Sequence, residues 1–442
     1  HLWGCTGYYG ELPMRTLSWA LMACAFLAGQ TWAAALPTKY EIAAGSNIAT
    51  INTGIAGTSV NSKAFGSGTS SGVDNTSSAF LKDSTKNILV TVDSTAGQTA
   101  HNLDWTISKV FFTRKAPTIG MWVYFTDATK WQNCSVFITP NSYTDYFSAS
   151  FIGIRALRSG WNFYQLHKDD FSVGGGSPVW TSTMTTMRLQ CTGVNGQIGT
   201  LYVDQNYTEF YSRPHVVFTF DVHNLTTHSS AYPILAGHHW KGSLYLSGNS
   251  LATGGFLSNV QIQELADAGW DLLSHTQTSP DLTTLNAAQI QSELSTAEAS
   301  LAAQGFALTG KHLAYPSGSF NTAVQDAVAA AGYLTGADAS GMTQAPISTA
   351  KGFDSGFYRV VRVGLDSGVS LAQAKAEVDQ VIKRGGLTVF LIHNLAGAAG
   401  SLQWASADLQ SLSDYIARFE PQVTVDTLHN WYRGYHGSRR VR

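Results

Sequence analysis

The stretch that decides the fold reads Val216-Val217-Phe218-Thr219-Phe220-Asp221-Val222-His223-Asn224. Apolar and β-branched residues lead directly into an acid, and polar, turn-forming residues follow it. This pattern predicts a buried strand that carries the Asp221 carboxylate to the mouth of an α/β fold. A carboxylate at the edge of an apolar core is costly unless something pairs with it or uses it. Asp221 is therefore the first candidate for a functional residue.

Strands and helices alternate after this stretch. Further strands are predicted over residues 243–247, 271–274, 312–315, 333–337, 357–363 and 387–392. Between and after them, helices are predicted around 233–236 and over 259–268, 286–304, 321–331, 370–384 and 405–419, with Asn259, Asn286 and Ser370 as caps. Such alternation implies parallel strands wrapped by helices. About seven strands predict a distorted or incomplete TIM-like (β/α) barrel.

Four polar side chains stand at or just past the carboxyl ends of predicted strands, namely Asp221, His275, Tyr315 and His393. Barrels of this type assemble their active sites on that face, so we expect the four to lie close together. A buried histidine that only makes a hydrogen bond is the ordinary alternative for His275 and His393. Their shared position at the rim favours a functional role.

The first half of the chain has a different pattern. Between residues 37 and 207, short β-rich runs are separated by Gly, Ser, Asn and Asp clusters, which predicts a β-sandwich or jelly roll. Residues 44–78 are rich in Gly, Ser, Thr and Asn and are expected to loop widely. The runs 160–164 and 199–204 resemble sandwich modules that bind carbohydrate. A flat aromatic face for sugar could come from Trp105, Trp122, Trp131, Trp161 and Trp180, although core or rim positions are the more ordinary interpretation for most of them.

Length, charge and the N-terminal region set the broad class. A chain of 442 residues is expected to form two domains. Its net charge of -2 gives no reason to expect nucleic acid as a partner, and a polysaccharide fits better. Residues 14–35 are typical of a signal peptide, and their apolar run is too short to span a membrane. Residues 1–13 precede this segment and are expected to be an extension outside the fold. We therefore expect a secreted or periplasmic protein. For Cys134 and Cys191 the sequence leaves two possibilities, a disulfide and two buried free thiols.

Four motifs in order are similar to those of the polysaccharide deacetylases, the NodB-like carbohydrate esterase family four. Thr219-Phe220-Asp221-Val222-His223 stands where that family has T-F-D-D-G. His275-Thr276-Gln277-Thr278-Ser279-Pro280 stands in place of H-S/T-x-x-H-P. Tyr315-Pro316-Ser317-Gly318 matches the Y-P-x-G subgroup, and Phe390-Leu391-Ile392-His393 matches the final L-x-H. The resemblance spans roughly residues 216–419.

The resemblance implies a hydrolytic chemistry and roles for these residues. In the family, a divalent metal polarises an N-acetyl carbonyl and activates water. Carried over by position, Asp221 is the base and His393 is the acid that protonates the leaving amine. Tyr315 would lie near the oxyanion, helped by a backbone N–H of its loop. Arg359 or Arg362 would pair with Asp221, and Tyr315 and Arg362 are the candidates for substrate or oxyanion contact.

The family's metal ligands are only partly present. Their three positions hold Val222, His275 and Ser279, of which only the histidine is a good zinc ligand. One account rebuilds a zinc site from His223 and His275, with Asp221 or Asp281 as the third ligand. In the other account the metal is lost, and the barrel either binds glycan without cleaving it or hydrolyses by another route. Three further histidines follow nearby, and we expect them first to be surface residues: His228, His238 and His239.

The sequence thus predicts two domains, a β-sandwich over residues 37–207 and a deacetylase-type barrel over 214–435. The preferred function is hydrolysis of N-acetyl or similar acyl groups on an amino-sugar polysaccharide. The alternative is a non-catalytic glycan-binding or surface protein built on a decayed deacetylase barrel.

Overall fold

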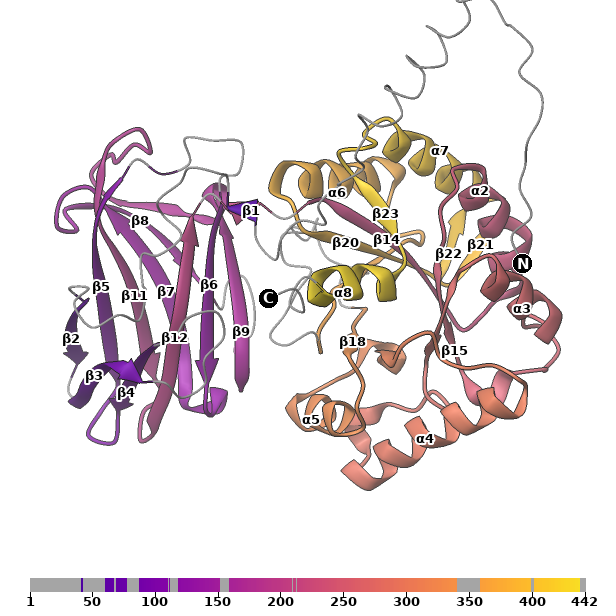
Figure 1. Cartoon of the computed structure of the whole chain (residues 1–442), viewed down its shortest axis with the longest axis horizontal. Helices are drawn as coiled ribbons and strands as arrows, with labels where there is room; N and C mark the ends of the chain where they lie inside the picture. The colour runs from indigo at the N-terminus through magenta and orange to yellow at the C-terminus, as the bar shows by residue number, and fades with distance from the viewer. Residues whose placement is uncertain are drawn as a thin grey trace, which may run out of the picture.

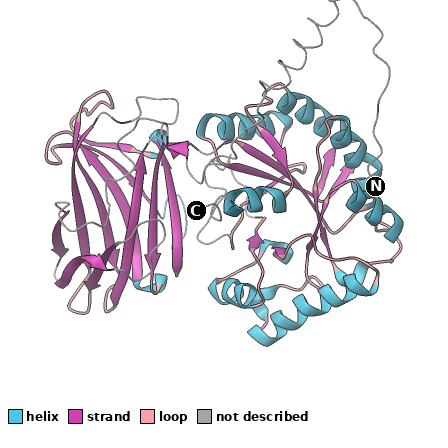
Figure 2. Ribbon diagram, in the orientation of Figure 1, coloured by secondary structure: helices cyan, strands magenta, loops and turns pink. Residues whose placement is uncertain are grey.

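The structure is a computed structural model. It describes residues 41–42, 60–66, 69–77, 87–109, 111, 118–151, 159–208, 210–211, 213–339, 358–398 and 401–437. In these ranges the chain forms a β-rich half and a half of strands wrapped by helices, which lie side by side (Figures 1 and 2). The leader expected over 14–35 and the extension before it lie outside the described residues. No helix in the described ranges is both long and apolar enough to cross a membrane.

The β-rich half consists of two antiparallel sheets. One has the strand order β10-β8-β7-β11-β5-β2 and the other has the order β3-β4-β12-β6-β9. The short strands β1 (Glu41–Ile42) and β13 (Phe210–Tyr211) pair separately. The remaining strands are β2 (Val60–Gly66), β3 (Thr69–Ser77), β4 (Asn87–Asp93), β5 (Thr99–Lys109), β6 (Thr118–Phe125), β7 (Trp131–Thr139), β8 (Asp145–Ser150), β9 (Gly160–His167), β10 (Ser172–Gly175), β11 (Met184–Gly193) and β12 (Ile198–Thr208).

Side chains from both sheets form one hydrophobic core. In β6, Ile119, Met121 and Val123 are fully buried, as expected when alternate side chains of a strand face the same side. Cys134 of β7 lies opposite Cys191 of the neighbouring β11, and the two form a disulfide. Of the two readings that the sequence left open for these cysteines, the structure has the disulfide.

The wide loop expected over residues 44–78 is wrong for the part that the structure describes. β2 pairs with β5 and β3 pairs with β4, and each lies at the edge of its sheet. An edge strand satisfies its backbone on one side only and is free to carry small polar side chains. Residues of this kind are depleted in strands on average, so composition alone predicted a loop.

The second half is built on a ring of parallel strands in the order β18-β17-β16-β15-β14-β20-β19. The ring closes where Val360 pairs with Ala337, and the Val360 N–H donates to Gly336 O at 2.7 Å. The predicted distorted or incomplete (β/α) barrel is therefore present, in the form of a curled parallel sheet. Its strands are β14 (His215–Asp221), β15 (Ser243–Leu246), β16 (Asp271–Ser274), β17 (His312–Ala314), β18 (Thr335–Ala337), β19 (Val363–Gly364) and β20 (Leu387–Ile392), with β23 (Thr424–Asp426) beside the start of β14.

Helices cover the outside of this ring in Figure 2. They are α2 (Tyr232–Gly237), α3 (Asn259–Asp267), α4 (Ala287–Ala303), α5 (Thr322–Ala330), α6 (Leu371–Arg384), α7 (Ser406–Ala417) and α8 (Leu428–Gly437), with a π-helical turn η3 (Thr227–Ala231) and the strand pair β21 (Asn394–Ala396) and β22 (Gln403–Ala405). Asn286 and Ser370 cap α4 and α6 as predicted. The cap expected at Asn259 is wrong by one residue, because Ser258 forms a capping box with Gln261.

Strand alternation explains how β14 positions the acid. Phe218 and Phe220 pack into the cluster formed with the surrounding helices, while Val217 belongs to the cluster formed by residues from β15, β16, β17, β18 and β20. Because side chains alternate along a strand, Thr219 and Asp221 share the face of Val217. Asp221 therefore ends the inward-facing row of the strand, at its carboxyl end.

The opposite end of the barrel is covered by α8, which the sequence analysis did not predict. Leu428 and Trp431 of this helix join the inner cluster. Its first backbone N–H groups bind the starts of two strands: Leu428 N–H donates to Ser243 Oγ at 2.9 Å, and His429 N–H donates to Asp271 Oδ2 at 2.8 Å. Helix α8 thus covers the amino ends of β15 and β16, so a functional site is expected at the carboxyl ends.

Two ion pairs connect the halves of the chain in the described residues. Lys383 Nζ lies 2.6 Å from Asp169 Oδ2, and Arg384 NH1 lies 2.9 Å from Asp170 Oδ1. Both cations are in the last turn of α6, and both acids are in a short 3-10 turn, η2 (Lys168–Asp170), after β9. The Arg384–Asp170 pair is the more buried of the two and is the better anchored contact.

Candidate active site at the carboxyl ends of the strands

A buried ion pair between Asp221 and Arg362 lies at the centre of this mouth. Arg362 NH1 and NH2 donate to the two carboxylate oxygens at 2.6 and 2.9 Å, and neither side chain is more than 3% exposed. Burial alone would raise the pKa of Asp221, but the guanidinium of Arg362 and the imidazole of His275 outweigh it. They hold the pKa of this carboxyl well below its usual range, so Asp221 is an anion at any working pH.

His275 connects this acid to a hydroxyl. Its Nε2 lies 3.6 Å from Asp221 Oδ2, and its Nδ1 lies 3.3 Å from Ser279 Oγ. Its backbone N–H donates to Leu246 O at 2.8 Å, which fixes the residue to the end of β15. The ring is buried, whereas Ser279 is half-buried. Asp221, His275 and Ser279 therefore form a continuous chain of polar contacts that ends near solvent.

The loop that presents Ser279 is held rigidly. Glu293 of α4 accepts hydrogen bonds from the N–H groups of Gln277 and Thr278, at 3.0 and 2.9 Å. The Ser279 N–H donates to Thr276 Oγ1 at 3.0 Å, and both of these residues have left-handed backbone, with φ of 56° and 65°. Such backbone is unfavourable for residues with a β-carbon and persists only where surrounding contacts impose it.

His393 follows β20 at the same mouth and is half-buried. Burial lowers its pKa, and the charge on Asp221 acts in the opposite direction. Arg362 and His275 also act on its charge, which places all of these groups within electrostatic reach of one another. The structure thus brings Asp221, His275 and His393 together at one rim, as the strand-end positions led us to expect.

Tyr315, Arg359 and Arg362 bind other groups of the protein and are not placed to contact substrate. The Tyr315 hydroxyl is buried and donates to Tyr358 O at 2.7 Å, and its N–H donates to Ala337 O at 2.9 Å. Arg362 is fully buried behind Asp221 and also donates from Nε to Asp338 O at 2.8 Å, so it does not reach substrate. The expected partner of Asp221 is therefore Arg362, while Arg359 pairs with Asp338 at 3.0 Å.

Two N–H groups of the loop after Tyr315 are already bound within that loop. The Gly318 N–H donates to Tyr315 O, and the Ser319 N–H donates to Pro316 O, both within the turn η6 (Pro316–Gly318). Ser317 has φ of 56°, another left-handed residue at this rim. The neighbouring Ser319 also acts on Asp281, which lies just beyond Ser279.

The rebuilt metal site expected from His223 and His275 is not formed. His223 Nε2 faces Ser250 O at 3.3 Å, and burial lowers the pKa of this ring to about 4. Both ring nitrogens of His275 face Asp221 and Ser279, and both Asp221 oxygens bind a guanidinium whose charge repels a cation. Across the described residues, no group of three or more His, Cys, Asp or Glu side chains is arranged to hold a metal.

The other candidate ligands lie elsewhere. Asp281, the alternative third ligand, is exposed and accepts a hydrogen bond from the Thr283 N–H at 2.9 Å, where it caps a short turn, η5 (Leu282–Thr284). His228 and His238 pair with Glu264 and Asp414 at 2.6 and 3.1 Å, in agreement with their interpretation as surface residues. His239 is exposed as well. The side chains present here do not fit a divalent metal.

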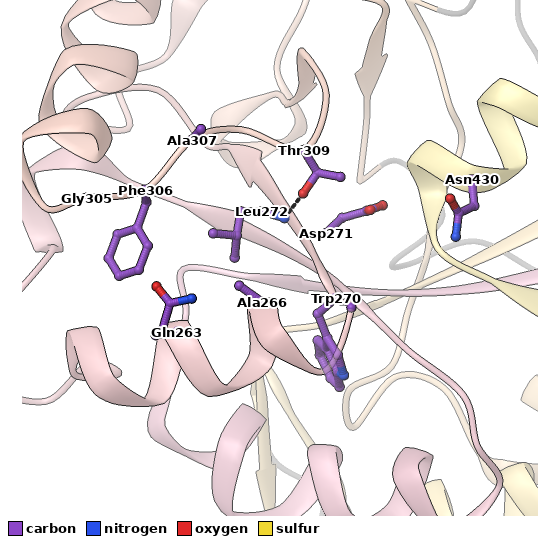
Figure 3. Close-up of a pocket in the computed structure, with 11 residues that line it drawn as sticks. Gln263, Ala266, Trp270, Asp271, Leu272, Gly305, Phe306, Ala307, Thr309 and Asn430 are labelled. Atoms are coloured by element: carbon purple, nitrogen blue, oxygen red, sulfur yellow. Dashed lines mark hydrogen bonds between the residues drawn. The ribbon is translucent and has the colours of Figure 1, made fainter. Parts of the chain in front are cut away.

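A cavity of about 310 Å³ lies away from this mouth (Figure 3). Asp271, Leu272 and Thr309 line it together with Asn430 of α8. Asp271 begins β16, whereas His275 follows its last residue, so the two sites are separated by about 13 Å at the usual rise of a strand. Burial raises the pKa of Asp271 to about 6. We therefore assign the cavity to the closed end of the barrel and not to the active site.

Sequence reasoning missed one functional candidate at the mouth, the hydroxyl of Ser279. The motif alignment identified its position only as that of a lost histidine ligand. The available signal was the spacing of four residues between His275 and Ser279 in a tight loop. That spacing became informative only with the observed turn, in which the Ser279 hydroxyl approaches Nδ1 and also lies 2.8 Å from Ser247 Oγ.

Comparison with known proteins identifies the class of this barrel. The Polysaccharide deacetylase family profile matches residues 210–336, which include Asp221, His275, Ser279 and Tyr315. YxkH of Bacillus subtilis (strain 168), whose name assigns it provisionally to the polysaccharide deacetylases, is 28% identical over 155 residues. That alignment covers 35% of this chain and 53% of YxkH, so the chain spans about half the length of this curated relative. Residues 210–336 are thus similar to the polysaccharide deacetylases, the NodB-like carbohydrate esterase family four.

Solved structures described as family 4 carbohydrate esterases resemble the chain more distantly. A family 4 carbohydrate esterase from Streptomyces lividans in complex with acetate is 19% identical, with a TM-score of 0.33, over 48% of this chain and 92% of the other. A protein from Bacillus anthracis described as a CE4 family pseudoenzyme is 16% identical, with a TM-score of 0.33, over 50% of this chain and 68% of the other.

Proposed function

We propose that the barrel hydrolyses N-acetyl or similar acyl groups on an amino-sugar polysaccharide. The observation that carries this proposal is the convergence of an acid and two imidazoles, Asp221, His275 and His393, at the carboxyl ends of the barrel strands. Groups of this kind move protons to and from a reacting acyl group. The similarity of residues 210–336 to the polysaccharide deacetylases supports the substrate class.

In this proposal His393 is the acid that gives a proton to the leaving nitrogen. It is half-buried at the rim, where an outside substrate reaches it. The family motif assigns the base to Asp221, but the Arg362 pair makes this carboxylate a weak proton acceptor. We therefore give Asp221 the task of orienting His275 and of stabilising positive charge on that ring, and no step passes through a metal.

Export is a further part of the proposal. The leader-like residues 14–35 support it, and so does the Cys134–Cys191 disulfide, because such bonds persist in oxidising compartments. A secreted or periplasmic location would place the barrel beside cell-wall or environmental polysaccharides. Fractionation of a full-length, epitope-tagged protein in a bacterial host, with and without residues 14–35, tests the location directly.

Acetate release is the test of the activity. The full chain is incubated with chitin oligomers and with peptidoglycan, and free acetate is measured enzymatically. We expect release by the wild type and a loss of about 100-fold or more in His393→Ala and Asp221→Asn. The control His239→Ala changes an exposed ring outside the mouth and is expected to keep full turnover. Full activity in His393→Ala would remove the acid from the proposal.

A second candidate function is glycan binding without cleavage. Two observations favour it: two of the family's three ligand positions hold Val222 and Ser279, and Arg362 occupies both oxygens of Asp221. Calorimetric titration with the same oligomers separates the two functions. Saturable binding with no acetate released by the wild type supports the binding protein and contradicts the hydrolase.

A further inference from the structure

We propose that Ser279 is a nucleophile that accepts the acyl group from the substrate and that His275 activates it. This inference rests on the proposed hydrolysis and replaces the activated water of the family mechanism with a side chain. The contact between Ser279 Oγ and His275 Nδ1, at 3.3 Å, carries the inference. A hydroxyl beside an imidazole that a carboxylate orients is the general arrangement of an activated serine.

The tautomer of His275 follows from its neighbours. Asp221 stays ionised because Arg362 binds both of its oxygens, so it only accepts hydrogen bonds. The His275 Nε2, 3.6 Å away, is therefore the nitrogen that carries the proton. Nδ1 is left with a lone pair directed to Ser279, as a general base requires. Both contacts are somewhat long, as catalytic hydrogen bonds often are without substrate.

The surroundings of Ser279 suit a nucleophile better than a structural hydroxyl. Its loop is fixed by Glu293 and by left-handed backbone at Thr276 and Ser279, and strained backbone of this kind is concentrated at functional sites. Ser247 Oγ, 2.8 Å away, and the backbone carbonyl of His275, 3.4 Å away, are further polar partners that orient the hydroxyl. Ser279 remains half-buried, so a substrate carbonyl can approach it.

The reaction balances with water as the only co-reactant. Ser279 Oγ forms a bond to the acyl carbon as its proton passes to His275 Nδ1. The carbon–nitrogen bond breaks as His393 gives a proton to the leaving nitrogen, which departs as an amine; the proton held by His275 then passes through water to His393, which restores both imidazoles. Water, deprotonated by His275, then attacks the acyl-serine ester. The products are a carboxylic acid and the free hydroxyl of Ser279.

Covalent labelling tests this inference without knowledge of the polysaccharide. The full chain is treated with p-nitrophenyl acetate, quenched in acid and mapped by peptide mass spectrometry, and separately treated with a fluorophosphonate. We expect an acetyl or phosphonyl group on Ser279 in the wild type, about 100-fold slower labelling in His275→Gln, and no label there in Ser279→Ala. The exposed Ser229, which only donates to Leu225 O, is the internal control and stays unlabelled.

Two cysteine variants provide a second test, which does not depend on removing the side chain at position 279. Ser279→Cys and Ser229→Cys each place a thiol on the surface of the same barrel, and their alkylation by iodoacetamide is compared across pH. Activation by His275 predicts that the thiol at 279 reacts at least about 10-fold faster near neutral pH and that His275→Gln removes this advantage. Equal rates at both positions contradict the activation.

The outcomes separate this inference from the proposed hydrolysis. Acetate release that is unchanged in Ser279→Ala, with no adduct on Ser279, overturns the nucleophile and leaves the hydrolase standing. Labelling of Ser279 with no acetate released from any polysaccharide supports the nucleophile and contradicts the polysaccharide assignment. If Ser279 is not labelled and no acetate is released, both the nucleophile and the proposed hydrolysis are overturned.

Discussion

The guanidinium of Arg362 holds both carboxylate oxygens of Asp221 in a buried pair, at 2.6 and 2.9 Å. The same side chain donates to Asp338 O at 2.8 Å, next to the seam where Val360 pairs with Ala337. One arginine therefore ties the end of β14 to the place where the barrel closes. The pair has two tasks, because it also keeps Asp221 charged beside His275.

The first prediction concerns the stability that this pair supports. Arg362→Leu leaves a buried carboxylate without its partner, so we expect the free energy of unfolding to fall by about 3–5 kcal/mol. Urea denaturation followed by fluorescence measures the change. The control Lys311→Met breaks an exposed pair with Glu298 and should cost less than about 1 kcal/mol. Similar losses in both variants would show that the buried pair is not special.

The second prediction concerns the pH dependence of turnover. His393 donates a proton only in its charged form, and burial lowers its pKa below the usual value. Activity should therefore be lost as pH rises through that lowered pKa, on the acid side of about 6.5. The profile of kcat against pH, on a substrate with an amide leaving group, measures this limb. If the loss of activity occurs at the same pH in His393→Gln, the titrating group is a different residue.

The third prediction concerns metal. The donors at the mouth do not fit a divalent cation, so the purified protein should carry far less than one zinc per chain by elemental analysis. Prolonged treatment with a chelator should leave both acetate release and Ser279 labelling unchanged. Stoichiometric zinc that is lost in His275→Ala or in His223→Ala would contradict this prediction and restore the rebuilt site.

The fourth prediction concerns acid stability of the β-rich half. His101 in β5 is buried, neither ring nitrogen has a partner in the described chain, and burial lowers its pKa to about 4. The unfolded chain binds this proton more readily, so the stability is complete above about pH 6.5 and falls between there and pH 4. The difference corresponds to about 3 kcal/mol for this residue.

The variant His101→Leu tests that prediction. We expect it to narrow the gap between the unfolding free energies at pH 7.5 and pH 4 by about 3 kcal/mol, because leucine takes up no proton. Leu103→Ala, on the same strand, is the matched control, since it should lower stability equally at both pH values. An unchanged gap in His101→Leu would mean that other groups cause the acid sensitivity.

The sequence predicted the elements that carry a strong apolar pattern. The strands over residues 271–274 and 387–392 have the predicted bounds, and Asn286 and Ser370 cap the predicted helices. These features depend on local chemistry, which a single sequence records. The edge strands β2 and β3 were missed because the stretch that contains them is rich in Gly, Ser, Thr and Asn. Helix α8 was missed because its packing partners come from distant strands.

The site was predicted at the level of strand ends but not of contacts. Four residues were expected at one rim, yet the choice between Arg359 and Arg362 depended on which side chain faces the barrel interior. Only the register of a very short strand decides that. Likewise, the contact between Ser279 and His275 depends on left-handed backbone at two loop residues, which spacing alone does not specify.

The Cys134–Cys191 bond lies wholly within the β-rich half, and every other cysteine of the chain precedes it. The barrel contains no sulfur that a reductant can change. Closing a span of 57 residues, the bond is worth about 4 kcal/mol in chain entropy to the half that contains it. Thiol treatment should therefore act selectively: it destabilises the β-rich half and leaves the barrel unchanged, so that the barrel serves as an internal standard.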